Sequence, residues 1–458
     1  MTIGTLFVGP LSAPALALSI VLVAAHRWLL AWRTLLALFI SSILLVPSNI
    51  YKLPSVLLLD IEIYRLAAAI ILVSWITALL VDSNLRLRKT HLDVQMLLLI
   101  LAFFLAMIVN LTDFEPTEEF ATAVKAFLHF ATFILLFYFV ISTFKNTVDV
   151  ESTLKFIVLL GAIVSIFGII ERLSGYNLFR HLHEWVPMLR ADPYFINSQL
   201  WRGGIRVAGS AAHPIAFSAL LAMIAPLAWH YWQSAKKTGE KLGFGLSCAL
   251  IVVAIVLTGS RTGFVGLVAA LTILIVGVPK RRMQILGATL AAFFLIHMLF
   301  PGAIGTIRTF LTPSYVEKIE VGNRAGRLED YPRIRQEFLK KPLFGRGFGT
   351  FDPLKFFWVD NQYLKFLVET GLLGTLAVLY FLCRVLINFW RSACLAEEPH
   401  KDLLISIMAS SLVFVVVLAT FDTFGFAQVP YLFFILVALG ESLVLNSKSI
   451  SRPVGIVQ

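Results

Sequence analysis

Residues 322–351 read GNRAGRLEDYPRIRQEFLKKPLFGRGFGTF, and residues 352–374 continue as DPLKFFWVDNQYLKFLVETGLLG. The first part is polar and rich in arginine, KPLFGRGFG forms a glycine turn, and the end lies inside a long apolar run. Residues 325–341 carry apolar side chains at helical spacing, namely Leu328, Tyr331, Ile334, Phe338 and Leu339. This pattern predicts an amphipathic helix on a membrane surface or over a cavity, followed by a membrane span.

The rest of the chain has the composition of an integral membrane protein. Of its 458 residues, 59% are hydrophobic and 14% are charged, whereas soluble domains average about 25% charged residues. Apolar runs recur along the whole length, which predicts one all-α polytopic body. The first apolar run lacks the basic segment and cleavage site of a signal peptide, so we expect it to remain as a helix.

A membrane span needs about 20 apolar residues. About 12–13 transmembrane helices are predicted on this basis, over residues 5–25, 34–50, 64–81, 94–111, 122–142, 154–172, 211–231, 243–258, 262–278, 284–300, 361–383, 403–420 and 428–445.

The short loops predict the orientation of these spans. Lysine and arginine gather in alternate loops, at Arg27, Arg33, Arg86, Arg88, Lys89, Lys145, Lys236, Lys237, Lys241, Lys280, Arg281, Arg282, Arg384, Arg391, Lys448 and Arg452. Such loops are typically cytoplasmic, which leaves the long loops 173–210 and 301–360 and the N-terminus outside. The net charge of +11 has the same explanation, so no nucleic acid is expected as a partner.

The outer loops carry arginines. Loop 173–210 contains Arg180, Arg190, Arg202 and Arg206, loop 301–360 contains Arg327 and Arg346 among others, and Arg261 lies between two spans in TGSRTG. The planar guanidinium binds phosphate through two parallel hydrogen bonds. These arginines therefore indicate an anionic ligand, such as a lipid-linked phosphate or pyrophosphate.

Pairing with loop acids or lipid head groups is the alternative role for most of these arginines. Arg206 and Arg261 differ because small residues flank them, Gly203, Gly204 and Gly209 in the first case and Gly259, Ser260 and Gly263 in the second. Small residues let a ligand approach the backbone closely, which favours a functional role for both.

Acidic residues follow the glycine turn. Asp360 and Asn361 lie at the start of the span, where a carboxylate can act as general base on a sugar hydroxyl or, alternatively, the pair can cap the helix. Glu369 lies about two turns deeper on the face of Asn361 and Lys365, where a charge is expected to pair or to line a cavity. Asp422 is a further acid near the outer end of its span. The three cysteines, Cys248, Cys383 and Cys394, show neither metal-ligand nor disulfide spacing.

Three blocks resemble the superfamily of O-antigen ligases and Wzy-type polysaccharide polymerases. They are RVAGSAAHPIAFSALLAMIAPLA at 206–228, LTGSRTGFVGL at 257–267, and KPLFGRGFGTF leading into DNQYLKFLVETGLLG. The resemblance implies a multi-span, GT-C-like glycosyltransferase that uses no metal and no cofactor. It also implies a core at 206–375 that includes outer loop 301–360, between N-terminal spans and the first long outer loop at 1–205 and C-terminal spans and a cytoplasmic tail at 376–458.

The resemblance further implies a donor glycan on undecaprenyl pyrophosphate, at the periplasmic face of the bacterial inner membrane. Arg206 and Arg261 would hold the pyrophosphate, Arg327 would assist, and Asp360 would act as base, with Glu369 or Asp422 as the alternatives. Apart from the resemblance, we expect Arg202, Arg346, Asn361 and Glu369 to bind substrate. Flippase and chain-length regulator proteins are possible partners in exopolysaccharide or O-antigen (lipopolysaccharide) synthesis.

Ligases carry a histidine where this chain has Asp360, which favours a polymerase that joins repeat units. Two alternatives stay open: a ligase that transfers the glycan to lipid A core or another acceptor, and a membrane transporter with Glu369 and Asp422 as ion-coupling groups.

Overall fold

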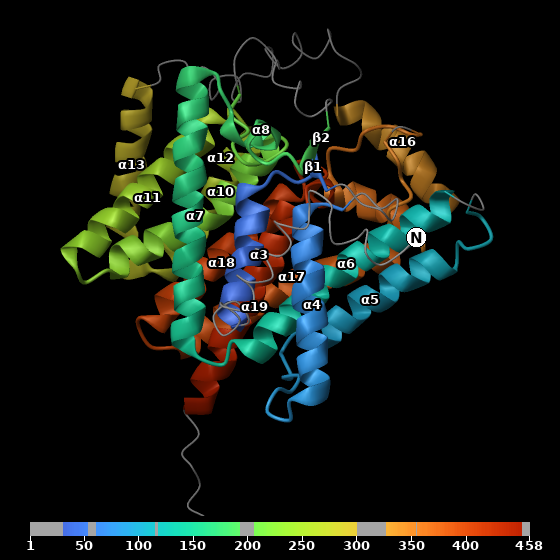
Figure 1. The fold of residues 1–458 in the computed structure, drawn as a ribbon, viewed down its shortest axis with the longest axis horizontal. Helices are drawn as coiled ribbons and strands as arrows, with labels where there is room; N and C mark the ends of the chain where they lie inside the picture. Colours follow the sequence, from blue (N-terminus) through green and yellow to red (C-terminus); the bar gives the residue numbers. More distant parts are fainter. Residues whose placement is uncertain are drawn as a thin grey trace, which may run out of the picture.

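The computed structural model describes residues 31–53, 61–114, 118–192, 206–299, 327–353 and 355–450. Figure 1 shows a bundle of helices with a small two-stranded sheet at one end. The helices are α3 (Trp32–Leu45), α4 (Ile63–Val81), α5 (Asp93–Ile108), α6 (Glu118–Thr143), α7 (Thr147–Ser174), α8 (Leu182–Trp185), α10 (Pro214–Ser234), α11 (Thr238–Leu257), α12 (Arg261–Gly277), α13 (Arg282–Leu299), α16 (Arg327–Lys340), α17 (Gln362–Leu395), α18 (His400–Val417) and α19 (Gln428–Ile450). Short 3-10 turns cover Leu178–Arg180, Pro279–Arg281 and Thr423–Gly425.

The fold confirms an all-α polytopic membrane protein. A helix lies at each predicted span except 5–25, which is outside the described residues. Within the described ranges, eight helices are long and apolar enough to cross a membrane: α4, α6, α7, α10, α11, α17, α18 and α19. The predicted 12–13 spans also included α3 and α5, which are shorter apolar helices, and α12 and α13 as separate spans. A bend of 109° separates α12 from the helix that follows it, and the pair brings the total to nine if counted as one broken span.

Helices α10 and α19 form the centre of the bundle. In the most apolar 18-residue stretch of each helix, 83% of the residues are buried in α10 and 94% in α19, whereas 28% are buried in α4 and in α11. The outward apolar side chains of α4 and α11 therefore suit contact with lipid. Glycines bring α12 against α10, because a Cβ on Gly263 would lie 2.8 Å from the Ser218 Cβ and one on Gly266 would lie 3.1 Å from the Ala222 Cβ.

The loops gather at two opposite ends of the bundle. At the basic end, Arg33 Nη1 lies 2.9 Å from Asp149 Oδ1 and Lys145 Nζ donates to Asn84 O at 3.3 Å. At the other end, β1 (Tyr51–Lys52) pairs antiparallel with β2 (Arg190–Ala191), which ties the loop after α3 to loop 173–210. Figure 1 shows α16 at this same end, which we call the site end.

Helix α16 matches the amphipathic helix predicted over 325–341. Ile334 is buried in a small core cluster with Phe351, Val359 and Val368, whereas Tyr331 is exposed. Ile334 therefore packs on the glycine loop and on α17, whereas Tyr331 and Leu339 on the predicted apolar side are exposed.

Helix α17 is broken at Gly371, where the backbone has φ 65° and ψ −164°. A break in a membrane helix exposes backbone N–H and C=O groups that lipid cannot satisfy. The glycine turn meets this need, since Leu372 N donates to Pro342 O at 2.9 Å and Gly347 N donates to Glu369 O at 2.9 Å. The stretch 341–351 thus folds back onto the helix that it precedes in sequence.

Candidate functional site

Two of the predicted arginine segments meet at the site end. Arg206 Nε donates a hydrogen bond of 3.1 Å to the carbonyl of Thr258, in the turn that leads to Arg261. Gly259 turns the chain there with φ 57°, and Arg261 is the first residue of α12. The N-terminus of a helix favours an anion because its first N–H groups lack helical partners. Arg206, Arg261 and this helix end together form a cationic surface that suits phosphate.

Buried polar residues hold the Arg206 segment from behind. The Glu171 carboxylate, at the end of α7, accepts hydrogen bonds from Ala208 N at 3.2 Å and from Gly209 N at 2.8 Å. Asn177 Nδ2 donates to Gly209 O at 3.0 Å. These contacts fix the backbone of residues 208 and 209, so the fold itself sets the position of the segment that follows Arg206.

His213 lies close enough to Arg206 and Arg180 for both charges to act on it. His213 is the N-cap of α10, and its Nδ1 accepts from Ile215 N at 3.2 Å, as expected for a residue before Pro214. Burial, together with the charges of Arg206 and Arg180, lowers the pKa of His213 to about 4. Arg180 is buried, and this burial lowers its pKa. The sequence did not distinguish Arg180 from the other loop arginines, because its burial depends on the tertiary structure.

The segment 418–426 connects the arginine surface to the start of α17. Thr262 Oγ1, next to Arg261, lies 3.0 Å from Thr420 Oγ1. Gln362 N donates to Leu418 O at 2.8 Å, and its side-chain Oε1 accepts from Phe424 N at 3.0 Å. The connection between α18 and α19 therefore joins the turn that carries Arg261, which we call the arginine wall, to the start of α17 next to Asp360, which we call the Asp360 wall.

Asp360 and Asn361 have different roles in the structure. Asn361 is the N-cap of α17, since its Oδ1 accepts from Tyr363 N at 3.0 Å and from Leu364 N at 3.2 Å. Asp360 precedes the cap and is exposed at the site end. The capping alternative is thus confirmed for Asn361, and Asp360 stays a prediction for the base.

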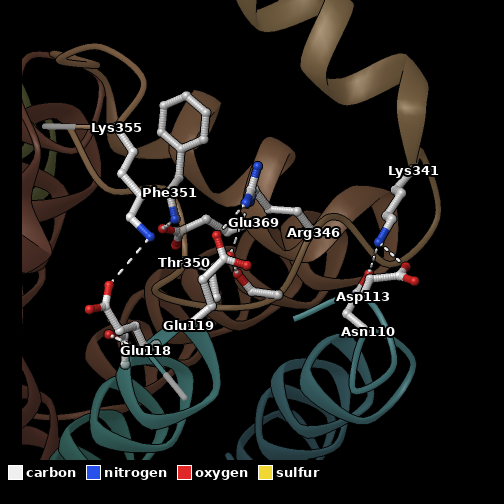
Figure 2. A network of polar contacts seen from close by, with 12 residues as sticks. Asn110, Asp113, Glu118, Glu119, Lys341, Arg346, Thr350, Phe351, Lys355 and Glu369 are labelled. Carbon is white, nitrogen blue, oxygen red and sulfur yellow. Dashed lines mark hydrogen bonds and ion pairs between the residues drawn. The ribbon is translucent and has the colours of Figure 1, made fainter. Parts of the chain in front are cut away.

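Arg346 and Glu369 belong to a second polar cluster, which anchors the glycine loop (Figure 2). Arg346 Nη2 lies 3.0 Å from Glu119 Oε1, and its guanidinium lies 4.2 Å from the Phe356 ring centre. Glu369 is 1% exposed and accepts from Phe351 N at 3.2 Å. Both side chains serve the fold, and their contact with substrate stays a prediction.

Lysines complete this anchoring cluster (Figure 2). Lys341 pairs with Asp113 and Asn110, and Lys355 Nζ lies 3.7 Å from Glu118 Oε2. Asp113 lies in the turn after α5 and Glu118 begins α6, so loop 341–355 is tied to a distant part of the sequence. Of the other predicted residues, Arg202 lies outside the described residues, and Arg327 begins α16 with a side chain that is not described.

The fold is that of a multi-pass helical membrane protein, and Arg206 and Arg261 lie at one end of it. Residues 246–379 match the family model described as O-Antigen ligase. The match confirms the resemblance to the O-antigen ligase and Wzy-type superfamily, and it indicates an enzyme of the glycosyltransferase kind. It runs from α11 to the middle of α17 and includes Arg261, Asp360 and the anchored loop, while Arg206 precedes it. No match is found among curated proteins.

Proposed function

We propose that this protein is a polysaccharide polymerase that joins oligosaccharide repeat units carried on undecaprenyl pyrophosphate. The observation that supports this most directly is the hydrogen bond between Arg206 and the turn before Arg261. It holds the Arg206 guanidinium at the turn that leads to Arg261, where a helix begins, and this arrangement suits the two phosphates of a lipid-linked donor. The apolar helices below suit the polyprenyl chain.

In the proposed reaction, a hydroxyl at the non-reducing end of an incoming repeat attacks the anomeric carbon of the growing chain. The new bond joins that hydroxyl oxygen to the carbon, and the bond from the carbon to the pyrophosphate oxygen breaks. The pyrophosphate leaves with the electron pair. Arg206 and Arg261 stabilise the leaving group, and Asp360 accepts the proton of the attacking hydroxyl.

The anchored loop 341–355 forms a rigid part of the surroundings of the proposed reaction. Loop 341–355 is tied to α5 and α6 by ion pairs and to α17 by backbone hydrogen bonds. Because the start of α17 is fixed by the Leu418 carbonyl and by the Asn361 cap, Asp360 is presented from a rigid element, as an active-site residue requires. We expect the site end to face the periplasm of the inner membrane.

A ligase is the second candidate, favoured by the description of the matching family. Both reactions use the same donor and the same leaving group, and they differ in the acceptor. Asp360 at the position of the ligase histidine is the feature that favours the polymerase.

The test is the full-length chain in nanodiscs with lipid-linked repeat units. Growth of longer glycans supports the polymerase, and transfer to an added acceptor lipid supports the ligase. Absence of both, with the wild-type chain folded, overturns glycosyl transfer and leaves the transporter. A matched control is Arg86→Ala, because Arg86 is exposed at the basic end and its Nε contacts Ser83 O.

A further inference from the structure

Helix α17 carries a lysine within the membrane span, one turn after its N-cap. Lys365 Nζ lies 2.8 Å from Asp422 Oδ2, and the side chains of both residues are 17% exposed. Charged groups inside a membrane span are costly and are retained where they pair or line the path of a ligand. An ion pair with this little exposure contributes little net stability, because desolvation offsets most of its attraction. Stability alone is therefore a weak reason for this lysine.

The ammonium group of Lys365 has donors to spare. An ammonium has three N–H donors, and among the described residues Asp422 is the hydrogen-bond partner that Nζ has. Asp422 is itself held, since its Oδ1 accepts from Gly425 N at 3.2 Å. Asp422 thus orients Lys365 and leaves part of its hydrogen-bonding capacity for another anion.

The pair of Lys365 and Asp422 connects the Asp360 wall with the arginine wall. Asp422 is two residues from Thr420, which contacts Thr262 beside Arg261. Two residues of chain span at most about 7 Å. Lys365 is also one turn after Asn361, on the same face of α17. The ammonium group therefore extends from α17, which follows Asp360. Asp422 holds it from the connection between α18 and α19, which also contacts Thr262 beside Arg261.

The charge of the leaving group gives such a cation a role. In the lipid-linked donor, the pyrophosphate is esterified at both ends and carries one negative charge on each phosphate. Breaking the bond to the sugar places a further negative charge on the departing oxygen. Arg206 and Arg261 match the charges already present in the donor, and a third cation would match the charge that develops in the transition state. Interactions that strengthen only in the transition state raise kcat rather than lower KM.

We propose that Lys365, oriented by Asp422, binds the departing pyrophosphate oxygen and acts as the third cation of the site. This inference rests on the proposed glycosyl transfer. Lys365 is then a substrate-binding residue and Asp422 is a positioning residue that acts through it.

The experiment compares Lys365→Met, Lys365→Arg, Asp422→Asn and the double variant Lys365→Met/Asp422→Asn in the full-length chain in nanodiscs. We expect Lys365→Met to lower kcat by about 100-fold and to change the donor KM less than threefold. Lys365→Arg keeps the charge and retains most of the rate. The matched control is Lys280→Met, which breaks the exposed pair with Glu398 at the basic end and should leave kcat unchanged.

A purely structural pair predicts the opposite pattern. Removing both charges together would then restore the activity lost in each single variant, because no unpaired charge would remain in the span. Under our proposal, the double variant stays as slow as Lys365→Met. Binding of undecaprenyl pyrophosphate gives a second readout, since this product carries the extra charge, and Lys365→Met should weaken it at least tenfold more than it weakens the donor.

The outcomes separate this inference from the proposed function. If the wild-type chain transfers glycan and Lys365→Met leaves kcat and product binding unchanged, the role of Lys365 is overturned and the function stands. Recovery of activity in the double variant also overturns it. If the wild-type chain transfers no glycan to any acceptor, the proposed function and this inference fall together.

Discussion

Gly345 and Gly371 lie against each other's chain segments, although one belongs to a loop and the other to a membrane helix. A Cβ on Gly345 would lie 2.4 Å from the Glu369 carbonyl carbon, and one on Gly371 would lie 2.4 Å from the Leu343 carbonyl carbon. Both residues have φ 65°, a conformation that L side chains rarely adopt. The glycine turn and the break in α17 therefore form one unit, which explains how a polar loop is fixed at the membrane.

The first prediction concerns this unit. Gly345→Ala and Gly371→Ala are each expected to destabilise the protein by at least about 1 to 3 kcal/mol, because strain at positive φ adds to a backbone clash. The measurement is the apparent Tm of the full-length chain in detergent. Gly287→Ala is the control, since Gly287 lies in α13 with no atom within 4 Å of its added Cβ. An unchanged Tm in both test variants would contradict the fit described above.

The second prediction concerns the arginine surface. Arg261→Ala should lower glycan transfer by about 100-fold or more while the chain still inserts and folds, because a cation at the leaving group is lost. Arg261→Lys should retain part of the activity, since it keeps the charge without the planar fork. Normal product length with Arg261→Ala would contradict the pyrophosphate assignment, provided that Arg86→Ala behaves as wild type.

The third prediction separates two adjacent residues. Asp360→Asn should lose most of the transfer activity with little change in Tm, because it removes a base but no cap. Asn361→Ala should lower stability by about 1 kcal/mol, because Tyr363 N and Leu364 N lose their acceptor. Asp360→His is expected to retain some activity, as a histidine can also accept a proton. Full activity of Asp360→Asn would remove Asp360 as the base.

The fourth prediction concerns the tie between the glycine loop and α6. Arg346 and Glu119 are both less than a quarter exposed and lie 3.0 Å apart, so removing one partner leaves a half-buried charge. A double-mutant cycle with Arg346→Ala and Glu119→Ala should give a coupling energy of about 1 to 2 kcal/mol. The exposed pair of Lys237 and Glu240, at 3.8 Å, serves as the reference and should couple by less than about 0.5 kcal/mol. Equal coupling in the two cycles would mean that the loop is not held by this pair.

The fifth prediction concerns pH. The folded pKa of His213 is about 4, below its ordinary value of 6.5, so the unfolded chain takes up the proton first as the pH falls. Its contribution to stability is complete above about pH 6.5 and is lost as the pH falls toward about 4. His213→Asn keeps a capping side chain and removes the titration. The Tm of this variant should therefore fall less steeply than that of wild type between these values, and parallel curves would contradict the assignment.

Hydropathy and helical periodicity were sufficient to predict much of the fold of this protein. They predicted the all-α class, the positions of the helices within the described residues and the helix α16, whereas fewer of these helices than predicted are long enough to span a membrane. The glycines beside Arg206 and Arg261 were expected to let a ligand approach, which stays a prediction, and Gly209 and Gly259 adopt positive φ.

Only the tertiary structure decided which polar residues pair with each other and hold the fold. Arg346 and Glu369 resemble site residues in sequence, yet their partners are Glu119 and the backbone of Phe351. Lys365 and Asp422 were noted separately in the sequence, and only the structure shows that their side chains lie 2.8 Å apart. The physical reason is that periodicity shows which side of a helix is apolar but not which helices are neighbours. A charge inside a membrane bundle takes its role from the residue across from it, and that residue can lie anywhere in the chain.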